Sequence, residues 1–377
     1  MDQDGKPHSP IAPVAGATRV AAFEVYCTRF LDPAGKPRGP LPDFARDAET
    51  LRQLYRAMVR VRVFDHRAIA LQRTGHLGTY GACLGQEAVA VAIGHAMRPE
   101  DVLLPTYREY AAQFQRGVEL VDILLYWGGD ERGMAFAQGT EQGPGSQDFP
   151  ICIPVASHMP HAVGVAYAFK LRREPRVAVC VLGDGGTSKG DFHEGLNAAG
   201  AWQLPLVVMV NNNQWAISVP RAAQTAAQTL AQKAIAAGIP GEQVDGCDII
   251  AVRERLGAAL ERARRGEGPA LIETLSYRLC DHTTADDASR YRSAEEVQAA
   301  WQQEPVRRLR TYLAAQDWWD EAQEKKLLAD CEAEVEAAVQ RYQAIAPRRP
   351  AAMFDHLYAE LPSAYTAQRD ELEKRDG

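Results

Sequence analysis

The chain of 377 residues is long enough for one large domain or roughly two to three smaller ones. Hydrophobic residues make up 46% and charged residues 24%, a composition typical of folded enzymes that excludes a disordered or fibrous chain. The net charge of −7 argues against non-specific binding of nucleic acid or of an anionic membrane. Seven cysteines without a CxxC pair argue against a disulfide framework or a zinc cluster and favour a reducing compartment.

No apolar run reaches the roughly 18–20 residues that a membrane-spanning helix needs. The first ten residues, MDQDGKPHSP, carry two acidic side chains and lead into no long apolar stretch, so we expect no secretory signal. We therefore expect a cytoplasmic protein that binds neither membrane nor nucleic acid.

The first part of the chain is predicted to be an arm followed by a long helix. Residues 1–45 are rich in Pro and Gly, and only the alternating stretch 19–30 is suited to an edge strand. From residue 49 to about 73, apolar residues recur at helical spacing, and Thr50 is suited to cap that helix.

The middle of the chain alternates between predicted helices and strands. The helices are expected at 85–97, 160–172, 189–202 and 248–265, and the strands at 102–104, 177–182, 206–210 and 270–277. Continuous apolar strands that alternate with helices are typical of a parallel sheet with helices on both faces. We therefore expect an α/β domain over residues 46–292.

Two further segments stand apart from this alternation. Residues 128–150 hold six glycines and little periodic apolar pattern, and a loop of that length inside a domain is usually functional or disordered. Residues 293–377 read as charged helices without strands, so we expect a C-terminal helical extension.

Polar residues follow two neighbouring strands of the predicted sheet. The strand at 177–182 leads into a glycine-rich sequence, Gly183, Asp184, Gly185 and Gly186, and the strand at 206–210 leads into three asparagines that end at Asn213. Because parallel strands present their carboxyl ends at the same edge, we expect the Asp184 and Asn213 side chains to lie close together. Their oxygens suit Mg²⁺, and the glycines and the following helix N-terminus suit a phosphate group. The pattern predicts a site for a diphosphate bound to Mg²⁺.

Two other interpretations of this segment remain open. A dinucleotide-binding fingerprint would require Gly or Ala at position 188, where this chain has Ser188. A glycine-rich turn that closes a strand–helix crossover, with Asp184 as a helix cap, needs no ligand at all.

Segments along nearly the whole chain, from about Leu51 to Leu361, resemble one enzyme family in the same order. They are GQEAVAVAIG (85–94), LPTYREY (104–110), IPVASHMPHAVGVAYA (153–168), GDGGTSKGDFHEGLNAAGAW (183–202), NNQWAIS (212–218), AGIPGEQVDGCD (237–248) and DHTTADDASRYRS (281–293). The family is the alpha subunit of the thiamine-diphosphate-dependent decarboxylating (first) component of 2-oxoacid dehydrogenase complexes. The resemblance implies the thiamine-diphosphate-binding fold and thiamine diphosphate with Mg²⁺ as cofactors.

The resemblance also implies roles for single residues. Asp184, Asn213 and the backbone carbonyl of Trp215 would coordinate Mg²⁺, beside the cofactor-binding Gly183, Gly185 and Gly186. Tyr107 and Arg108 would contact the diphosphate, and the permanent charge of Arg108 suits phosphate oxygens.

Four more residues complete the expected site. Ile153 and Val155 would offer backbone groups to the aminopyrimidine ring of the cofactor. Arg278 and His282 would lie beside the diphosphate at the active-site entrance, on a loop that runs to about residue 292. An imidazole that titrates near neutrality is suited to proton transfer or to binding a substrate carboxylate, whereas a surface role without catalysis is the alternative for His282.

The resemblance implies partners as well. In this family a Glu of a separate beta subunit activates the cofactor, and no second α/β domain is evident after Ser293. We therefore expect an assembly of two alpha and two beta subunits, with a lipoyl-bearing acyltransferase component as the acceptor of the acyl group. Residues 128–150 and 279–292 are candidate gates of the active site.

The substrate expected is a 2-oxoacid, with pyruvate favoured over branched-chain 2-oxoacids such as 3-methyl-2-oxobutanoate. GGTSKGDFHEGLNAAGAW is most similar to bacterial pyruvate dehydrogenase alpha subunits, whereas PVASHMPHAVGVAYA and RYRSAEEV are closer to the branched-chain enzymes. Cys152, Ser157 and His158 stand where the branched-chain family holds potassium with Ser, Thr and Gln. A non-catalytic binding protein on the same fold and a nicotinamide-dependent oxidoreductase stay open as alternatives.

Overall fold

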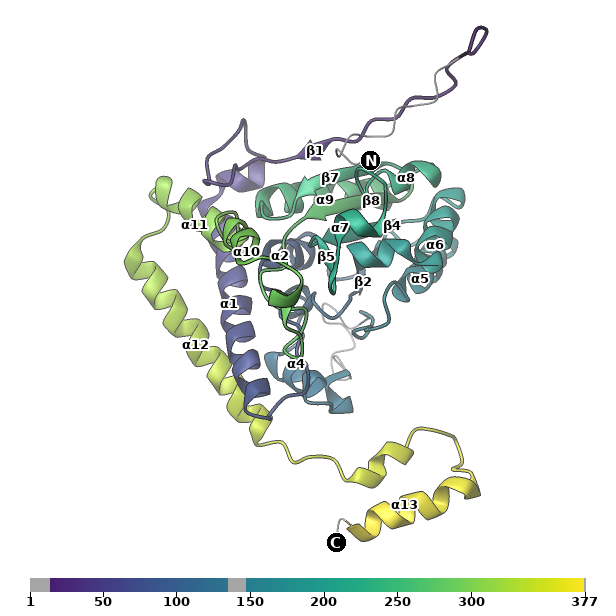
Figure 1. Ribbon diagram of the computed structural model, residues 1–377, viewed down its shortest axis with the longest axis vertical. Coiled ribbons are helices and arrows are strands. Elements are labelled where there is room, and N and C mark those ends of the chain that lie inside the picture. The colour runs from purple at the N-terminus through teal and green to yellow at the C-terminus, as the bar shows by residue number, and fades with distance from the viewer. Residues whose placement is uncertain (1–13, 135–146, 376–377) are drawn as a thin grey trace.

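The fold is built on a parallel sheet of six strands in the order β1-β7-β8-β4-β3-β2. The structure, a computed structural model, describes residues 14–134 and 147–375 (Figure 1). The strands are β1 (Cys27–Thr28), β2 (Val102–Leu104), β3 (Ala178–Gly183), β4 (Leu206–Asn212), β7 (Gly241–Asp245) and β8 (Ala270–Leu275). A separate antiparallel pair joins β5 (Trp215–Ala216) and β6 (Val219–Pro220).

Helices cover both faces of this sheet, as predicted. Side chains of a strand point alternately to its two sides, and those of β3 divide accordingly. Val179 and Val181 belong to one buried cluster, which includes residues of α2 (Glu87–Ala96) and α9 (Ile249–Arg264). Cys180 and Leu182 belong to a second cluster with residues of α5 (His158–Arg172) and α6 (Gly190–Ala201). The α/β prediction with a doubly covered parallel sheet is therefore confirmed.

The first long helix, α1 (Ala48–Arg73), begins one residue earlier than predicted and has a different cap. The Asp47 side chain accepts hydrogen bonds from the backbone N–H groups of Glu49 and Thr50. The Thr50 hydroxyl itself donates to Asp47 instead of capping the helix. An aspartate reaches two free N–H groups at a helix start and adds a favourable charge there, so Asp47 takes the cap position that we predicted for Thr50.

The helices after residue 293 pack largely onto this body. They are α10 (Ala294–Trp301), α11 (Pro305–Ala315), α12 (Glu321–Gln343) and α13 (Ser363–Arg375), and residues 294–375 contain no strand. α12 runs alongside α1 (Figure 1), and buried side chains of α11 and α12 share one cluster with α1 and the sheet. α13 contacts the short 3₁₀ turn Pro350–Phe354 and lies apart from the sheet (Figure 1).

Several elements were not predicted from the sequence. They are β7 and the short helices α3 (Tyr110–Gln115), α4 (Leu120–Trp127), α7 (Arg221–Gln224) and α8 (Lys233–Ala236). In the N-terminal arm, β1 pairs with β7 at the edge of the sheet, and the residues before it extend away from the body (Figure 1). No helix in the described parts of the chain is long and apolar enough to cross a bilayer.

Candidate functional site

A cavity of about 620 Å³ opens at the carboxyl ends of β3 and β4. This is the edge at which parallel α/β sheets bind ligands. Every residue that we predicted for the site lines this cavity except Arg278; those lining it are Tyr107, Arg108, Ile153, Val155, Gly183, Asp184, Gly185, Gly186, Asn213, Trp215 and His282. Residues far apart in the sequence are therefore gathered around one space.

Asp184 and Asn213 follow two strands that are directly paired. β3 and β4 run side by side, with Gly183 opposite Asn211. Asp184 is buried, and this burial raises the pKa of its carboxyl group. Its side chain accepts a hydrogen bond from the amide of Gln224, and among the described residues no basic side chain forms an ion pair with it. The charges of Arg278 and Arg221 act against this rise in pKa without contacting the carboxylate, and a bound cation would offset the remaining cost of its burial.

Asn213 is held in place by two hydrogen bonds. Its Nδ2 donates to Oε1 of Gln86 over 3.0 Å, and its Oδ1 accepts the backbone N–H of Trp215 over 3.2 Å. Asn211 donates to the same Gln86 oxygen over 3.1 Å. Gln86 lines the cavity and was not singled out from the sequence. The only signal was a polar residue between Gly85 and Glu87 at the start of an otherwise apolar helix.

The glycines after β3 leave room for a ligand against the backbone. A side chain at Gly183 would meet no atom within 4 Å, so that position faces open space. A Cβ at Gly185 would lie 2.8 Å from Cβ of Ala216, and a Cβ at Gly186 would lie 2.9 Å from Leu182. A side chain at Gly185 would therefore clash with Ala216, and one at Gly186 would require the end of the Leu182 side chain to move, so the turn packs closely against its neighbours. This arrangement fits a phosphate group next to the main chain.

Arg108 and His282 form one wall of the cavity. The Arg108 guanidinium is buried and donates to the carbonyl oxygens of Ala82 and, over 2.5 Å, of His282. Nδ1 of His282 lies 3.3 Å from Nη2 of Arg108 and 3.4 Å from Nη1 of Arg278. Both neighbours are donors, so Nδ1 acts as the acceptor and the ring carries its hydrogen on Nε2.

The titration of His282 differs from our expectation. Burial, together with the charges of Arg108 and Arg278, lowers the pKa of its imidazole to about 4. The ring is therefore neutral near pH 7 in the cofactor-free chain, whereas the sequence led us to expect titration near neutrality. The difference arises because the fold buries the ring and also brings two permanent cations to it.

Arg278 contacts His282 and Trp215, which line the cavity, but is not itself a lining residue. The residue is fully buried and does not line the cavity. Its Nη1 donates to the Trp215 carbonyl over 3.2 Å, and its Nη2 donates to the Ile217 carbonyl and to the Tyr291 hydroxyl over 2.8 Å each. The charge that suggested phosphate binding is directed to these oxygens, so Arg278 positions the backbone that follows Asn213.

Apolar side chains complete the cavity on its open side. Ile153 and Val155 are 49% and 48% exposed, and Ile217 is 56% exposed. All three line the cavity. Apolar groups left accessible around a polar site mark a surface that a ligand or another chain covers.

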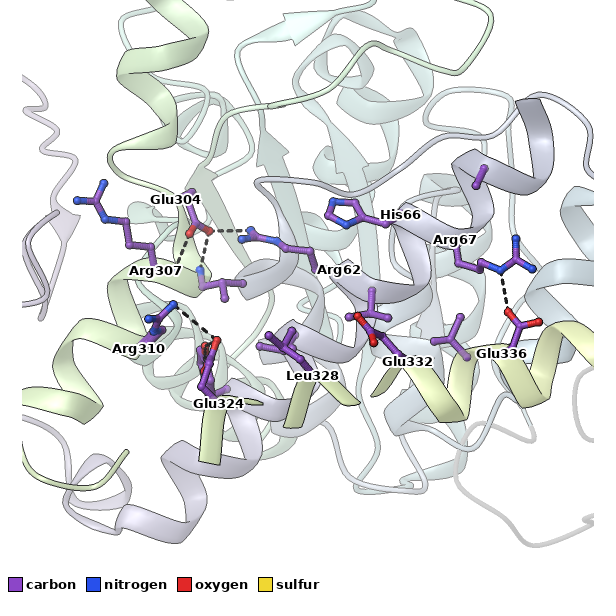
Figure 2. Close-up of a pocket in the computed structure, with 16 residues that line it drawn as sticks. Arg62, His66, Arg67, Glu304, Arg307, Arg310, Glu324, Leu328, Glu332 and Glu336 are labelled. Atoms are coloured by element: carbon purple, nitrogen blue, oxygen red, sulfur yellow. Dashed lines mark hydrogen bonds and ion pairs between the residues drawn. The ribbon is translucent and has the colours of Figure 1, made fainter. Parts of the chain in front are cut away.

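A second cavity, of about 630 Å³, lies between α1, α11 and α12 and contains none of the predicted site residues. Figure 2 shows Arg62 directed towards Glu304, Arg310 towards Glu324 and Arg67 towards Glu336, while the Arg307 guanidinium points away. Arg67 pairs with Glu336 at 2.9 Å, Arg310 with Glu324 at 3.7 Å and Arg62 with Glu304 at 2.6 Å. Its charges largely pair with one another, whereas Asp184 of the first cavity forms no direct ion pair with a described residue.

The donor atoms at Asp184 restrict which ion fits there. The described residues contain no group of three or more His, Cys, Asp or Glu side chains that could hold a metal ion. A cation at Asp184 would therefore depend on amide and carbonyl oxygens and on ligand oxygens. Such a set of oxygens suits Mg²⁺, which is commonly held by one or two carboxylates and by phosphates.

Comparisons with known proteins agree with this chemistry. The family model described as "Dehydrogenase E1 component" matches residues 55–350. The alpha subunit of the pyruvate dehydrogenase E1 component from Staphylococcus epidermidis is 39% identical over 330 residues, which cover 87% of each chain. The Staphylococcus aureus subunit of the same name is 38% identical over 330 residues with the same coverage. The subunit from Acholeplasma laidlawii is 38% identical over 328 residues, 86% of this chain and 93% of the relative.

Proposed function

The chain belongs to the dehydrogenase E1 component family, and from that premise we propose that it is the alpha subunit of the pyruvate dehydrogenase E1 component. The observation that carries the proposal is the buried Asp184, which has no direct ion-pair partner among the described residues and lines a cavity of about 620 Å³ together with Asn213 and a glycine turn. The names of the relatives favour pyruvate over a branched-chain 2-oxoacid.

Thiamine diphosphate, when bound, supplies the electron sink for decarboxylation of the 2-oxoacid. In this chain, the oxygens of Asp184 and Asn213 and the Trp215 carbonyl would hold Mg²⁺, which neutralises the diphosphate. The glycine turn would receive a phosphate group against its backbone. These groups bind and orient the cofactor.

The wall formed by Arg108 and His282 would bind the negative charge of the diphosphate and supply a hydrogen-bond donor near it. Arg108 and Tyr107 line the cavity and would contact phosphate oxygens. His282 would present its Nε2–H as a donor because Nδ1 faces two guanidinium groups. Ile153 and Val155 would cover the aminopyrimidine ring and keep water away from it.

The chain would complete its site with a beta subunit, in an assembly of two alpha and two beta subunits within the cytoplasm. The exposed apolar side chains at Ile153, Val155 and Ile217 support a partner chain over the open side of the cavity. A lipoyl group on the acyltransferase component would accept the acyl group through reductive acylation.

Loop 279–292 is proposed to gate that exchange by becoming more ordered when the cofactor binds. Arg292 holds it through the carbonyls of Arg278 and Cys280, and Thr284 exchanges hydrogen bonds with Tyr80. Limited proteolysis should cut this loop more slowly with the cofactor than without it, and equal rates would remove the support for gating. Residues 135–146 of the other candidate gate lie outside the described residues.

The substrate is tested by steady-state turnover of the chain reconstituted with its beta subunit, thiamine diphosphate and Mg²⁺. Pyruvate should be preferred over 3-methyl-2-oxobutanoate by at least about tenfold in kcat/KM, because a pocket shaped for a small acyl group excludes added methyl groups. A higher kcat/KM for 3-methyl-2-oxobutanoate would assign the chain to the branched-chain enzymes instead. No turnover of either 2-oxoacid would favour a non-catalytic protein on the same fold.

A further inference from the structure

Gln86 combines burial with an unsatisfied donor in the wall of the candidate site. The residue is 1% exposed and lines the cavity together with Asp184 and Asn213. Its Nε2 has no hydrogen-bond partner among the described residues. A buried amide donor without an acceptor is destabilising, so such groups usually have a partner in the working state of a protein.

The orientation of this amide follows from a donor that cannot be reversed. The backbone N–H of Trp215 donates to Asn213, so Asn213 must present its oxygen there and its Nδ2 to Gln86. The Ser276 hydroxyl donates to Oδ1 of Asn211, whose Nδ2 also points to Gln86. Two donors therefore meet Oε1 of Gln86, and its Nε2 is the group left free.

The backbone around Gln86 is also held in place, by the conformation of Gly85 and by hydrogen bonds of Glu87. Gly85 has a φ of +89°, and a Cβ there would lie 2.2 Å from the Tyr277 carbonyl, so only glycine fits. The next residue, Glu87, accepts the Gly85 N–H over 2.9 Å and Nε of Arg62 over 2.8 Å. Arg62 in turn bridges to Glu304, as Figure 2 shows. Gln86 therefore forms part of the cavity wall from a well-fixed helix start.

We propose that Gln86 is a binding residue for the diphosphate: its Nε2 donates to a phosphate oxygen, while its Oε1 orients Asn213 towards the metal ion. This inference rests on the proposed function and assigns a role within that site. A hydrogen bond to a charged oxygen is stronger than one between neutral groups, so the free amide is well suited to a phosphate. By holding Nδ2 of Asn213, the same side chain leaves the asparagine oxygen facing away from Gln86.

The test uses the reconstituted enzyme with both subunits and isothermal titration calorimetry at pH 8. Two ligands are compared, thiamine diphosphate and inorganic diphosphate, each with Mg²⁺. Gln86→Met removes donor and acceptor at nearly constant shape, and Gln86→Glu keeps the acceptor but loses the donor. The control Gln113→Met changes another buried glutamine, whose amide atoms have no partner in the described part of the chain and which does not line the cavity.

We expect Gln86→Met to weaken the binding of both ligands by about tenfold or more, and by similar factors, because the lost contact is to the diphosphate. Gln86→Glu should weaken binding further, since its carboxylate repels the ligand. Its affinity should then recover as the pH falls, when protonation restores an O–H donor, whereas the wild type shows no such gain. Gln113→Met should bind both ligands like the wild type.

Three results would overturn the inference. They are wild-type affinity in both Gln86 variants, a loss for thiamine diphosphate without a loss for inorganic diphosphate, and an equal loss in Gln113→Met. If Gln86→Met fails to assemble, the test is the affinity of Gln86→Glu for the two ligands and the change of that affinity with pH. Failure of the proposed function is distinguishable, because then the wild-type enzyme itself would bind no thiamine diphosphate with Mg²⁺.

Discussion

His282 is buried beside two guanidinium groups, and this environment keeps its imidazole neutral. Arg108 and Arg278 approach the same ring nitrogen at 3.3 and 3.4 Å. Burial and these two charges lower the pKa of His282 to about 4 in the chain without cofactor. A diphosphate would bring negative charge to this wall, which favours the protonated ring and raises the pKa again.

This yields a prediction for the titration of His282. In the cofactor-free enzyme its imidazole should titrate near pH 4, well below the ordinary value of about 6.5, and thiamine diphosphate with Mg²⁺ should move the midpoint upward. Histidine C–H resonances followed by NMR measure both midpoints, with His282→Gln as the assignment control. A cofactor-free midpoint at 6.5 or above would contradict the geometry described for this ring.

The sequence identified some residues of the site and missed others for clear reasons. Asp184 and Asn213 could be predicted because each directly follows a strongly apolar strand. That position places them at the carboxyl edge of the sheet, where their oxygens can bind a ligand. That Arg278 lies beside the diphosphate stays a prediction, and its hydrogen bonds to the carbonyl oxygens of Trp215 and Ile217 could not be predicted from its charge. Gln86 acts through contacts with residues more than a hundred positions away, which no local pattern records.

At the scale of elements, long amphipathic or strongly apolar segments were predictable and short ones were not. β3 and β4 each begin with five buried apolar residues, and α1 repeats its apolar positions over many turns. β7 has the sequence GEQVD, with a single large apolar side chain, and its place in the sheet comes from pairing with β8. α3 has only six residues, too few for a periodic pattern.

Two of the helices after residue 293, α11 and α12, share one core with the sheet, which predicts how they unfold. Leu309 of α11 is 1% exposed and packs in the same cluster as α1 and β3. Leu309→Ala should lower the free energy of unfolding by about 2–5 kcal/mol through the cavity it leaves. The proposed extension 293–377 is therefore expected to unfold together with domain 46–292, at least through α11 and α12.

Denaturant unfolding of the isolated subunit, followed by circular dichroism and tryptophan fluorescence, tests this expectation. The exposed Leu328, 39% accessible on α12, gives the control Leu328→Ala, which should change stability far less. Two separate transitions, of which Leu309→Ala shifts only one, would show instead that the C-terminal helices form an independent unit.

At the scale of the whole molecule, apolar side chains are exposed in places that a partner would cover. They border the cavity at Ile153, Val155 and Ile217, and in the N-terminal arm Val20 and Phe23 are 96% and 67% exposed. Such patches favour association with another chain. The assembly itself could not be predicted from the residues alone, because an exposed patch does not name its partner; the family resemblance supplied the beta subunit.

We therefore expect both the assembly and the activity of this chain to require the beta subunit. Sedimentation of the two co-expressed chains should give a species with two alpha and two beta subunits. Decarboxylation of pyruvate should require it, because this chain is proposed to lack the Glu that activates the cofactor. Full turnover by the purified alpha chain with cofactor and Mg²⁺ would refute this dependence.

The central claim is that Asp184 holds the metal ion through which the cofactor diphosphate binds. Calorimetric titration of the reconstituted enzyme with thiamine diphosphate, with and without Mg²⁺, measures it directly in the wild type, Asp184→Ala and the control Asp191→Ala. Asp191 lies on α6 and does not line the cavity. The account predicts Mg²⁺-dependent binding in the wild type and in Asp191→Ala, and a loss of affinity of at least about a hundredfold in Asp184→Ala. Binding that needs no Mg²⁺, or that survives unchanged in Asp184→Ala, would contradict it.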